Sequence, residues 1–194
     1  VLDGEYMNAG YKAEVTYLDG VLERVFSMPR VAEGWIAVTA DHGECLGEYE
    51  IWWDHAGLYP ENLDVPLILA GPRLPGGRRV EGPVEHLDLG RTLLDLAGLE
   101  SVPFPGESML RHLEEEPDPD TPRFALSSAA LSASLRLGDW HCILHLKDFR
   151  PRAGSEPFPA HSMELFDLGP DGDSLNNVAE QELDRARRMR TMIL

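Results

Sequence analysis

The residues with the clearest capacity for chemistry lie in Thr39-Ala40-Asp41-His42-Gly43-Glu44, directly after a short apolar run. Asp41 and His42 offer a carboxylate and an imidazole, a pair that suits a divalent cation such as Mg²⁺, Mn²⁺, Zn²⁺ or Ca²⁺. Consecutive residues of an extended strand point to opposite faces, so the two can share one ion only if the chain turns, and Gly43 permits that turn. The alternative is a turn cap at Asp41 and a surface side chain at His42.

Three other segments carry weaker signals. His55 could contact an anionic substrate or act as a general acid, or it could be a structural loop residue. His86 and Asp88 lie where a helix is expected to begin, and helix capping accounts for Asp88. Residues 167–172 resemble the start of an EF-hand loop, but the twelfth position is Val178 instead of the required Glu, which excludes calcium binding of that type.

The two cysteines, Cys45 and Cys142, are too few for a disulfide framework, and neither belongs to a CxxC pair. One disulfide between them remains open, and we expect two reduced thiols. Reduced thiols favour the cytoplasm as the location.

The first part of the chain has the pattern of an α/β protein. Two apolar, β-branched runs, 35–39 and 65–70, predict strands buried on both sides, as in parallel sheets covered by helices. Helical spacing predicts helices over 11–28 and 88–99. In such sheets ligands collect beyond the carboxyl ends of the strands, which is where Asp41 and His42 lie.

The last third has a different texture. The acidic, proline-broken segment after Leu113 predicts a solvated linker, and Gly138-Asp139 predicts a hairpin between strands at 132–137 and 140–146. A strand over 164–168 and a final helix, capped at Asn177 or a neighbour, complete the pattern. The expected units are therefore 1–113, an acidic linker at 114–123, and an α+β unit at 124–194.

Composition limits the partners. The chain has 194 residues, and 17 Lys+Arg against 34 Asp+Glu give a net charge of −17. Such a surface repels phosphate backbones, so we expect no nucleic acid partner. No apolar run approaches the roughly 20 residues that span a bilayer, so no membrane partner is expected either. A small anionic substrate requires a metal or basic groups to reverse the field locally.

Several segments, taken in order, resemble the sulfatase family of the alkaline phosphatase superfamily. Residues 38–48 are similar to its SDHGE-x-LGEH signature, and residues 55–68 to its H-x-x-LYEE-x-x-x-VPLI stretch. Further matches follow at 84–89, 92–99, 134–140 and 164–168, so the resemblance covers essentially the whole chain.

The resemblance implies an alkaline-phosphatase-like α/β sandwich, here the C-terminal part of its main mixed sheet, followed by a small antiparallel sheet with a helix. It implies hydrolysis of small anionic sulfate esters with one divalent metal, first of all Ca²⁺, with Mg²⁺, Mn²⁺ or Zn²⁺ as alternatives. Asp41 and His42 match metal ligands, and His55 matches a position that contacts the sulfuryl group. A homo-oligomer is also compatible with the family.

Two departures from the family pattern matter. The family nucleophile is a Cys or Ser in a Cys-x-Pro-x-Arg motif, with the Cys oxidised to formylglycine, and neither Cys45 nor Cys142 fits it. The upstream Asp-Asp metal pair is also lacking. The chain is therefore expected to be a C-terminal fragment that is inactive alone, with formylglycine supplied only by the upstream part.

A third departure leaves two alternatives. The residue after the metal-binding Asp is usually Asn in single-metal sulfatases, whereas here it is His42. That choice is similar to phosphonate and phosphodiester hydrolases of the superfamily. The other alternative is a non-catalytic assembly module.

Overall fold

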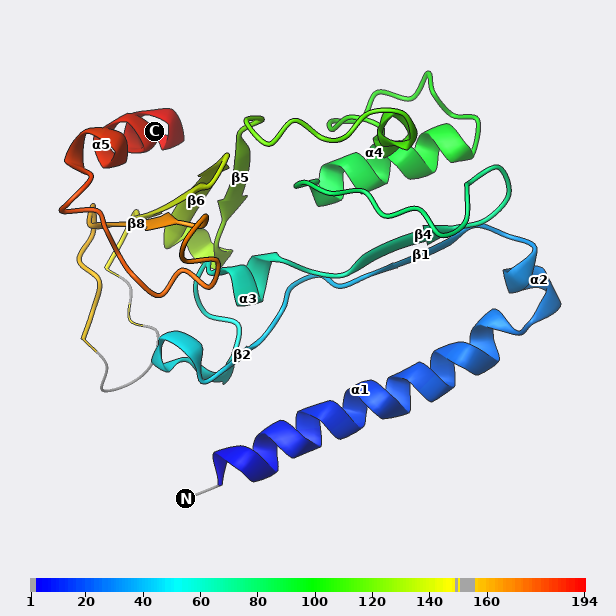
Figure 1. Ribbon diagram of the computed structural model, residues 1–194, viewed down its shortest axis with the longest axis horizontal. Helices are drawn as coiled ribbons and strands as arrows, with labels where there is room; N and C mark the ends of the chain where they lie inside the picture. Colours follow the sequence, from blue (N-terminus) through cyan, green and yellow to red (C-terminus); the bar gives the residue numbers. More distant parts are fainter. Residues whose placement is uncertain (1–2, 149, 151–155) are drawn as a thin grey trace.

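The computed structural model describes residues 3–148, 150 and 156–194 and has a mixed α/β architecture (Figure 1). The helices are α1 (Gly4–Phe26), α2 (Pro29–Ala32), α3 (Pro60–Leu63), α4 (His86–Leu96) and α5 (Leu183–Ile193). The strands are β1 (Ile36–Thr39), β2 (Cys45–Leu46), β3 (Trp52–Asp54), β4 (Leu67–Ala70), β5 (Arg123–Leu126), β6 (Ser132–Leu137), β7 (Trp140–His145) and β8 (Met163–Asp167).

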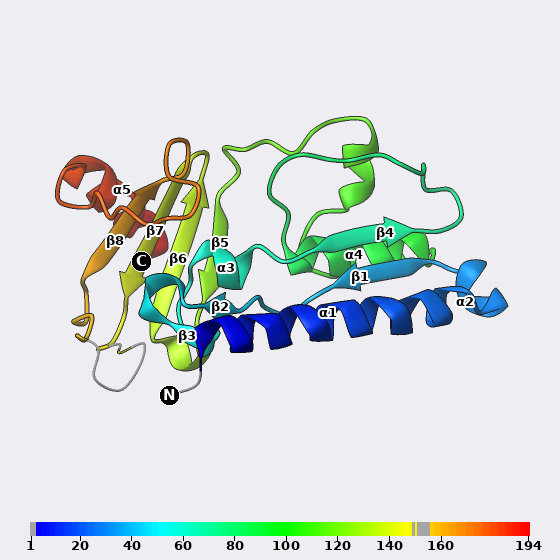
Figure 2. The same ribbon diagram turned by 60° about the horizontal axis from the view of Figure 1, so that its bottom comes forward.

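Strands β1 and β4 form a two-stranded sheet, with α4 on one side and α1 running along the other (Figures 1 and 2). The expectation of parallel strands buried on both faces is wrong for this pair. The strands are antiparallel, with Ile36 opposite Ala70, and successive residues alternate between half-buried and exposed. Among the described residues β1 has β4 as its hydrogen-bonded neighbour, so its apolar run is only partly covered.

The helix expected at 11–28 exists but begins earlier, at Gly4, because the side chain of Asp3 accepts a hydrogen bond from the Glu5 N–H. Its predicted apolar face does not form core. The helix has no buried residue, and Val15 and Leu18 are more than half exposed. Periodicity therefore predicted the helix but not what packs against it.

Helix α4 is fixed at its N-terminus by a reciprocal cap. The Glu85 N–H donates to the Asp88 carboxylate (3.0 Å), and the same carboxylate accepts the Glu107 N–H (2.8 Å). Asp88 thus caps this helix from inside its first turn, so capping accounts for the residue.

The C-terminal part is a four-stranded antiparallel sheet in the order β5-β6-β7-β8, with α5 beside it (Figure 2). The hairpin predicted around Gly138-Asp139 is confirmed, since Leu137 pairs with Trp140. The helix cap predicted at Asn177 is wrong: the Asn177 amide oxygen accepts the Leu165 and Ala179 N–H groups, and α5 begins only at Leu183.

Both faces of this sheet are covered. One face, with Leu135, Cys142 and Leu165, packs on Ala186 and Met189 of α5. The opposite face, with Ile143 and Phe166, packs on a group from the segment between β1 and β4: Cys45, Ile51, Leu58 and Tyr59. The C-terminal sheet therefore supports the segment that follows Asp41 and His42.

The expected acidic linker is an ordered loop between residue 113 and β5. Its Glu116 carboxylate accepts the Glu81 N–H (2.9 Å), and its Pro119 carbonyl accepts the Gly138 N–H (2.9 Å). The division into units at 114–123 stays a prediction. No helix in the described part of the chain is long and apolar enough to cross a membrane.

Candidate functional site

Gly43 brings the chain after β1 into close contact with α3. Its N–H donates to the Asn62 carbonyl (2.9 Å), and a Cβ placed on it would lie 1.9 Å from the Glu61 carbonyl oxygen. No side chain fits in that gap. The glycine therefore matters here for close approach; the turning freedom expected from the sequence is not used, since Gly43 is not among the glycines with positive φ.

Asp41 and His42 lie on this segment with different surroundings. The Asp41 carboxylate accepts the His42 N–H (3.0 Å) and is 91% exposed. The His42 Nδ1 lies 2.9 Å from the Gly43 carbonyl, which can only accept, so Nδ1 carries a proton. In the neutral imidazole Nε2 then holds the lone pair, and it lies 3.8 Å from the Asp41 carboxylate. The His86 ring nitrogen Nε2 contacts the Ala40 carbonyl (2.9 Å) and so holds the backbone just before Asp41.

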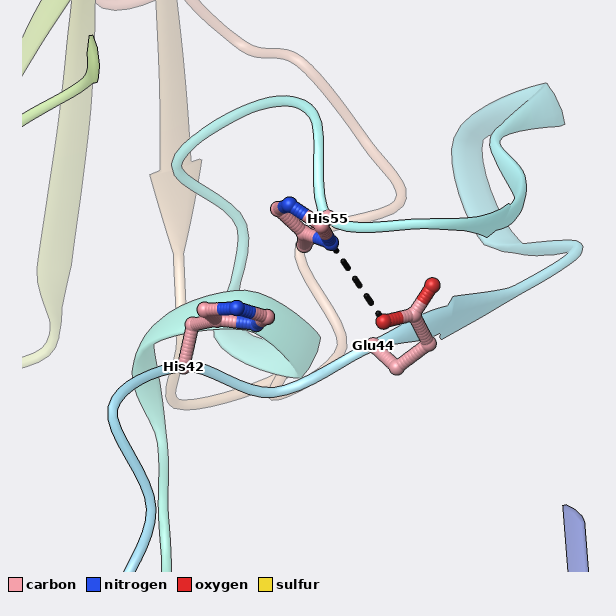
Figure 3. A group of neighbouring side chains, drawn as sticks. All are labelled: His42, Glu44 and His55. Carbon is pink, nitrogen blue, oxygen red and sulfur yellow. Dashed lines mark ion pairs between the residues drawn. The ribbon is translucent and has the colours of Figure 1, made fainter.

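His55 returns to the same place from the end of β3. Its ring stacks on that of His42, with centroids 4.0 Å apart, and its Nδ1 lies 3.5 Å from the Glu44 carboxylate (Figure 3). His42, Glu44 and His55 can each direct one ligand atom to within 4.8 Å of the others. The structure thus joins two of the residues singled out from sequence, His42 and His55, and adds Glu44.

Glu44 was not singled out as a ligand from sequence. The available signal was its spacing from His42, because residues i and i+2 of an extended segment point to the same side. Asp41 is outside the group of three, although its carboxylate lies 3.8 Å from the His42 Nε2.

Asn62 ties the His55 loop to the His42 segment. Its side-chain amide donates to the carbonyls of Ala56 (3.2 Å) and Gly57 (3.4 Å), and its amide oxygen accepts the Cys45 thiol (3.3 Å). Asn62 is buried, so these bonds are shielded from water. Sequence reasoning did not identify this residue.

A buried polar chain anchors the same loop to the C-terminal sheet. The Tyr59 hydroxyl donates to both oxygens of the Glu164 carboxylate (3.1 and 3.0 Å), which also lies 2.9 Å from His145 Nε2. The Ser132 hydroxyl lies 2.9 Å from His145 Nδ1. Burial and the Glu164 charge raise the Tyr59 pKa well above its usual range, so the hydroxyl keeps its proton and remains a donor.

The two cysteines are both free and buried, as expected. Burial, and then the Glu61 charge, raise the pKa of the Cys45 thiol to about 12. Burial and Glu164 likewise raise the pKa of Cys142 to about 12. Neither sulfur is a nucleophile at neutral pH, because the thiolate is the reactive form.

Comparison with known proteins bears on the family and the fold. The model of the sulfatase family matches residues 5–99, the part that contains Asp41, His42 and His55. Residues 5–99 of this chain belong to the sulfatase family.

Relatives with assigned names extend this match along the chain. Choline-sulfatase of Rhizobium meliloti is 30% identical over 88% of this chain, arylsulfatase K of Xenopus laevis is 26% identical over 94%, and the uncharacterized sulfatase YidJ of Escherichia coli is 35% identical over 56%. The chain spans only 32, 35 and 22% of those three proteins, respectively.

Solved structures confirm the α/β fold expected for the family. A protein solved in complex with its substrate D-glucosamine-2-N,6-O-disulfate superposes with a TM-score of 0.71 at 23% identity, covering 92% of this chain and 38% of that one. The phosphonate monoester hydrolase of Agrobacterium radiobacter gives a TM-score of 0.58, also at 23% identity, over 92% of this chain and 39% of that one.

Proposed function

We propose that this chain supplies one side of the active site of a metal-dependent sulfate-ester hydrolase. The observation that carries the proposal is the convergence of Asp41 and His42, from the end of β1, with His55, whose ring stacks on His42. These three residues belong to the two segments that resemble the family's motifs. The chemistry is therefore assigned to a place where those motifs meet in space.

The residues present suit a divalent metal. The exposed Asp41 carboxylate offers two oxygen ligands, and the Nε2 of a neutral His42 offers a nitrogen ligand. Carboxylate oxygen favours hard ions such as Ca²⁺ or Mg²⁺, while imidazole widens the choice to Mn²⁺ and Zn²⁺. A divalent ion held here would draw negative charge from the oxygens of a sulfate ester.

His55 is assigned the role of contacting the sulfuryl group of the ester. Glu44, 3.5 Å from its Nδ1, orients the imidazole and leaves Nε2 for the ester. Asn62 holds the backbone of the same loop, so the ring is presented from a fixed support. A protonated His55 would place a positive charge beside the sulfuryl oxygens and help the leaving group depart.

The substrate class follows from what the named relatives share. One relative is named for choline and the other was solved with a disulfated glucosamine, so the feature that the two names share is the sulfate group. We therefore propose a sulfate monoester of a small molecule, and sulfate over phosphonate because the named sequence relatives are sulfatases. The nucleophile, expected as formylglycine, is assigned to residues outside this chain. The free, buried thiols support the cytoplasm as the proposed location.

The test is His55→Ala in the enzyme that contains the nucleophile. We expect kcat/KM for an aryl sulfate to fall on the order of 10²-fold, the scale of one positioned acid or charge-stabilising group. Metal content should stay unchanged, whereas Asp41→Ala should lower it. Loss of metal in His55→Ala, or full turnover in that variant, would contradict the assigned role.

A further inference from the structure

Three ligand-bearing side chains lie on the accessible surface of the site, and the proposed function uses only two of them directly. His42, Glu44 and His55 come together above α3 (Figure 3). The side chains of His42 and His55 are 44% and 55% exposed, and that of Glu44 is 24% exposed. An ion from solvent can therefore reach all three.

The protonation pattern of His42 favours metal binding. Its Nδ1–H is donated to the Gly43 carbonyl, which leaves Nε2 as a lone-pair donor and fixes the ring orientation. Metal-bound histidines commonly use their second ring nitrogen in this way, to bind a backbone carbonyl. Glu44, on the same side of the extended segment, already reaches His55 Nδ1 at 3.5 Å.

The donor set discriminates between ions. Two imidazoles and one carboxylate match the ligands of open zinc sites, whereas Ca²⁺ and Mg²⁺ prefer shells made of oxygen. The rings are stacked, with 27° between their planes, so one ring must turn for both to face one ion. The His42 ring is held by its bond to the Gly43 carbonyl, so the turn is assigned to His55, whose side chain is 55% exposed.

We propose that His42, Glu44 and His55 form an inhibitory site for zinc, which overlaps the proposed Ca²⁺ or Mg²⁺ position at Asp41 because both use His42. The inhibitory part rests on the proposed function: zinc bound there occupies His42 and withdraws His55 from the sulfate ester. The site needs no further oxidant, reductant or cofactor, since the only change is coordination of Zn²⁺. Free zinc would therefore inhibit the enzyme by occupying His55, the residue proposed to contact the sulfate ester.

The test is calorimetric titration of this chain with Zn²⁺ and, separately, with Ca²⁺. We expect Glu44→Gln and His55→Gln each to weaken zinc binding at least about tenfold, since loss of even an outer partner costs that much at metal sites. Asp41→Asn should leave zinc affinity within a few-fold while weakening Ca²⁺ binding. Asp54→Asn, which keeps the hydrogen bond to the His55 N–H, is the matched control and should change neither.

A second readout locates the ion. In NMR spectra of the whole chain, zinc should shift the imidazole signals of His42 and His55 and leave those of His86 and His112 in place. The proposal is overturned if the chain binds no zinc, if either Gln variant binds it normally, or if Asp41→Asn removes it equally. Unchanged Ca²⁺ binding in Asp41→Asn, with zinc behaving as expected, would instead contradict the proposed hard-ion position and leave the zinc site standing.

Discussion

Cys45 follows Glu44 in the chain, but its sulfur faces the protein interior. It is fully buried, donates to Asn62, and lies near three carboxylates that oppose ionisation. With a pKa near 12, the thiolate is scarce at pH 7. We expect iodoacetamide to leave Cys45 unmodified in the folded chain and to modify it in urea, as measured by peptide mass spectrometry.

Cys142 is the internal comparison, since it is equally buried and its thiol pKa is raised to the same value. Both cysteines should therefore react only after unfolding. Rapid alkylation of native Cys45 alone, or the mass loss of a cysteine converted to formylglycine at that position, would show that the sulfur is part of the chemistry.

At the scale of residues, the sequence identified the polar side chains of the site but not which other side chains they contact. Asp41 and His42 could be selected because they follow an apolar run and precede a glycine. The contact of His42 with His55 depends on the path through β2 and β3, which no local pattern encodes. Asn62 and Glu164 were missed because their roles are hydrogen bonds to distant segments.

The approach of the β1 end to α3 depends on one missing side chain. Gly43→Ala places a methyl group against the Glu61 carbonyl, and a backbone atom cannot move aside cheaply. We expect this variant to lose about 2–3 kcal/mol of unfolding free energy in urea and to weaken divalent ion binding at Asp41 and His42. Gly76→Ala is the control, because nothing lies within 4 Å of a Cβ there. Equal stability of the two variants would refute the close approach.

The Tyr59 hydroxyl links the site loop to the C-terminal sheet. Tyr59→Phe keeps the ring, which stacks on Tyr49, but removes a donor from the carboxylate of Glu164, whose side chain is only 9% exposed. We expect a loss of about 1–3 kcal/mol in urea unfolding, the cost of leaving a buried polar group short of a partner.

The matched control for that hydroxyl is Tyr17→Phe, at a tyrosine that is 69% exposed on α1. Its effect should stay within about 0.5 kcal/mol, as for surface substitutions in general. If Tyr59→Phe were as mild as the control, the buried chain through Glu164 and His145 would not hold the loop.

Elements were predicted well where local signals suffice. The hairpin at Gly138-Asp139, strand β8 and helix α4 follow from turn chemistry and periodicity. The parallel arrangement expected for β1 was wrong for a different reason. An apolar run in the sequence indicates burial, but it does not indicate the direction of the neighbouring strand. The exposed face of α1 shows the same limit, because amphipathicity requires a partner that the helix itself does not specify.

At the scale of the molecule, the two parts of the fold contribute to the site in different ways. The β1–β4 part carries Asp41 and His42, and the C-terminal sheet supports the loop with His55 through Phe166, Glu164 and His145. An excess of acidic over basic residues surrounds this arrangement, with a net charge of −17. Under the proposed function, an anionic ester would have to be attracted by local positive charge, at the metal or at a protonated His55, because the long-range field repels it.

The chain alone should not turn over a sulfate ester. A sulfate ester requires a nucleophile beside the metal, and the chain's two thiols are both buried, with pKa values of about 12. Asp41 and His42 leave most of an ion's coordination shell to water, so charge stabilisation is also incomplete. We expect no hydrolysis of an aryl sulfate above background, with or without Ca²⁺, at protein concentrations where metal binding is measurable by calorimetry. Turnover that disappears in Asp41→Ala and persists through repurification would show that these 194 residues contain a nucleophile.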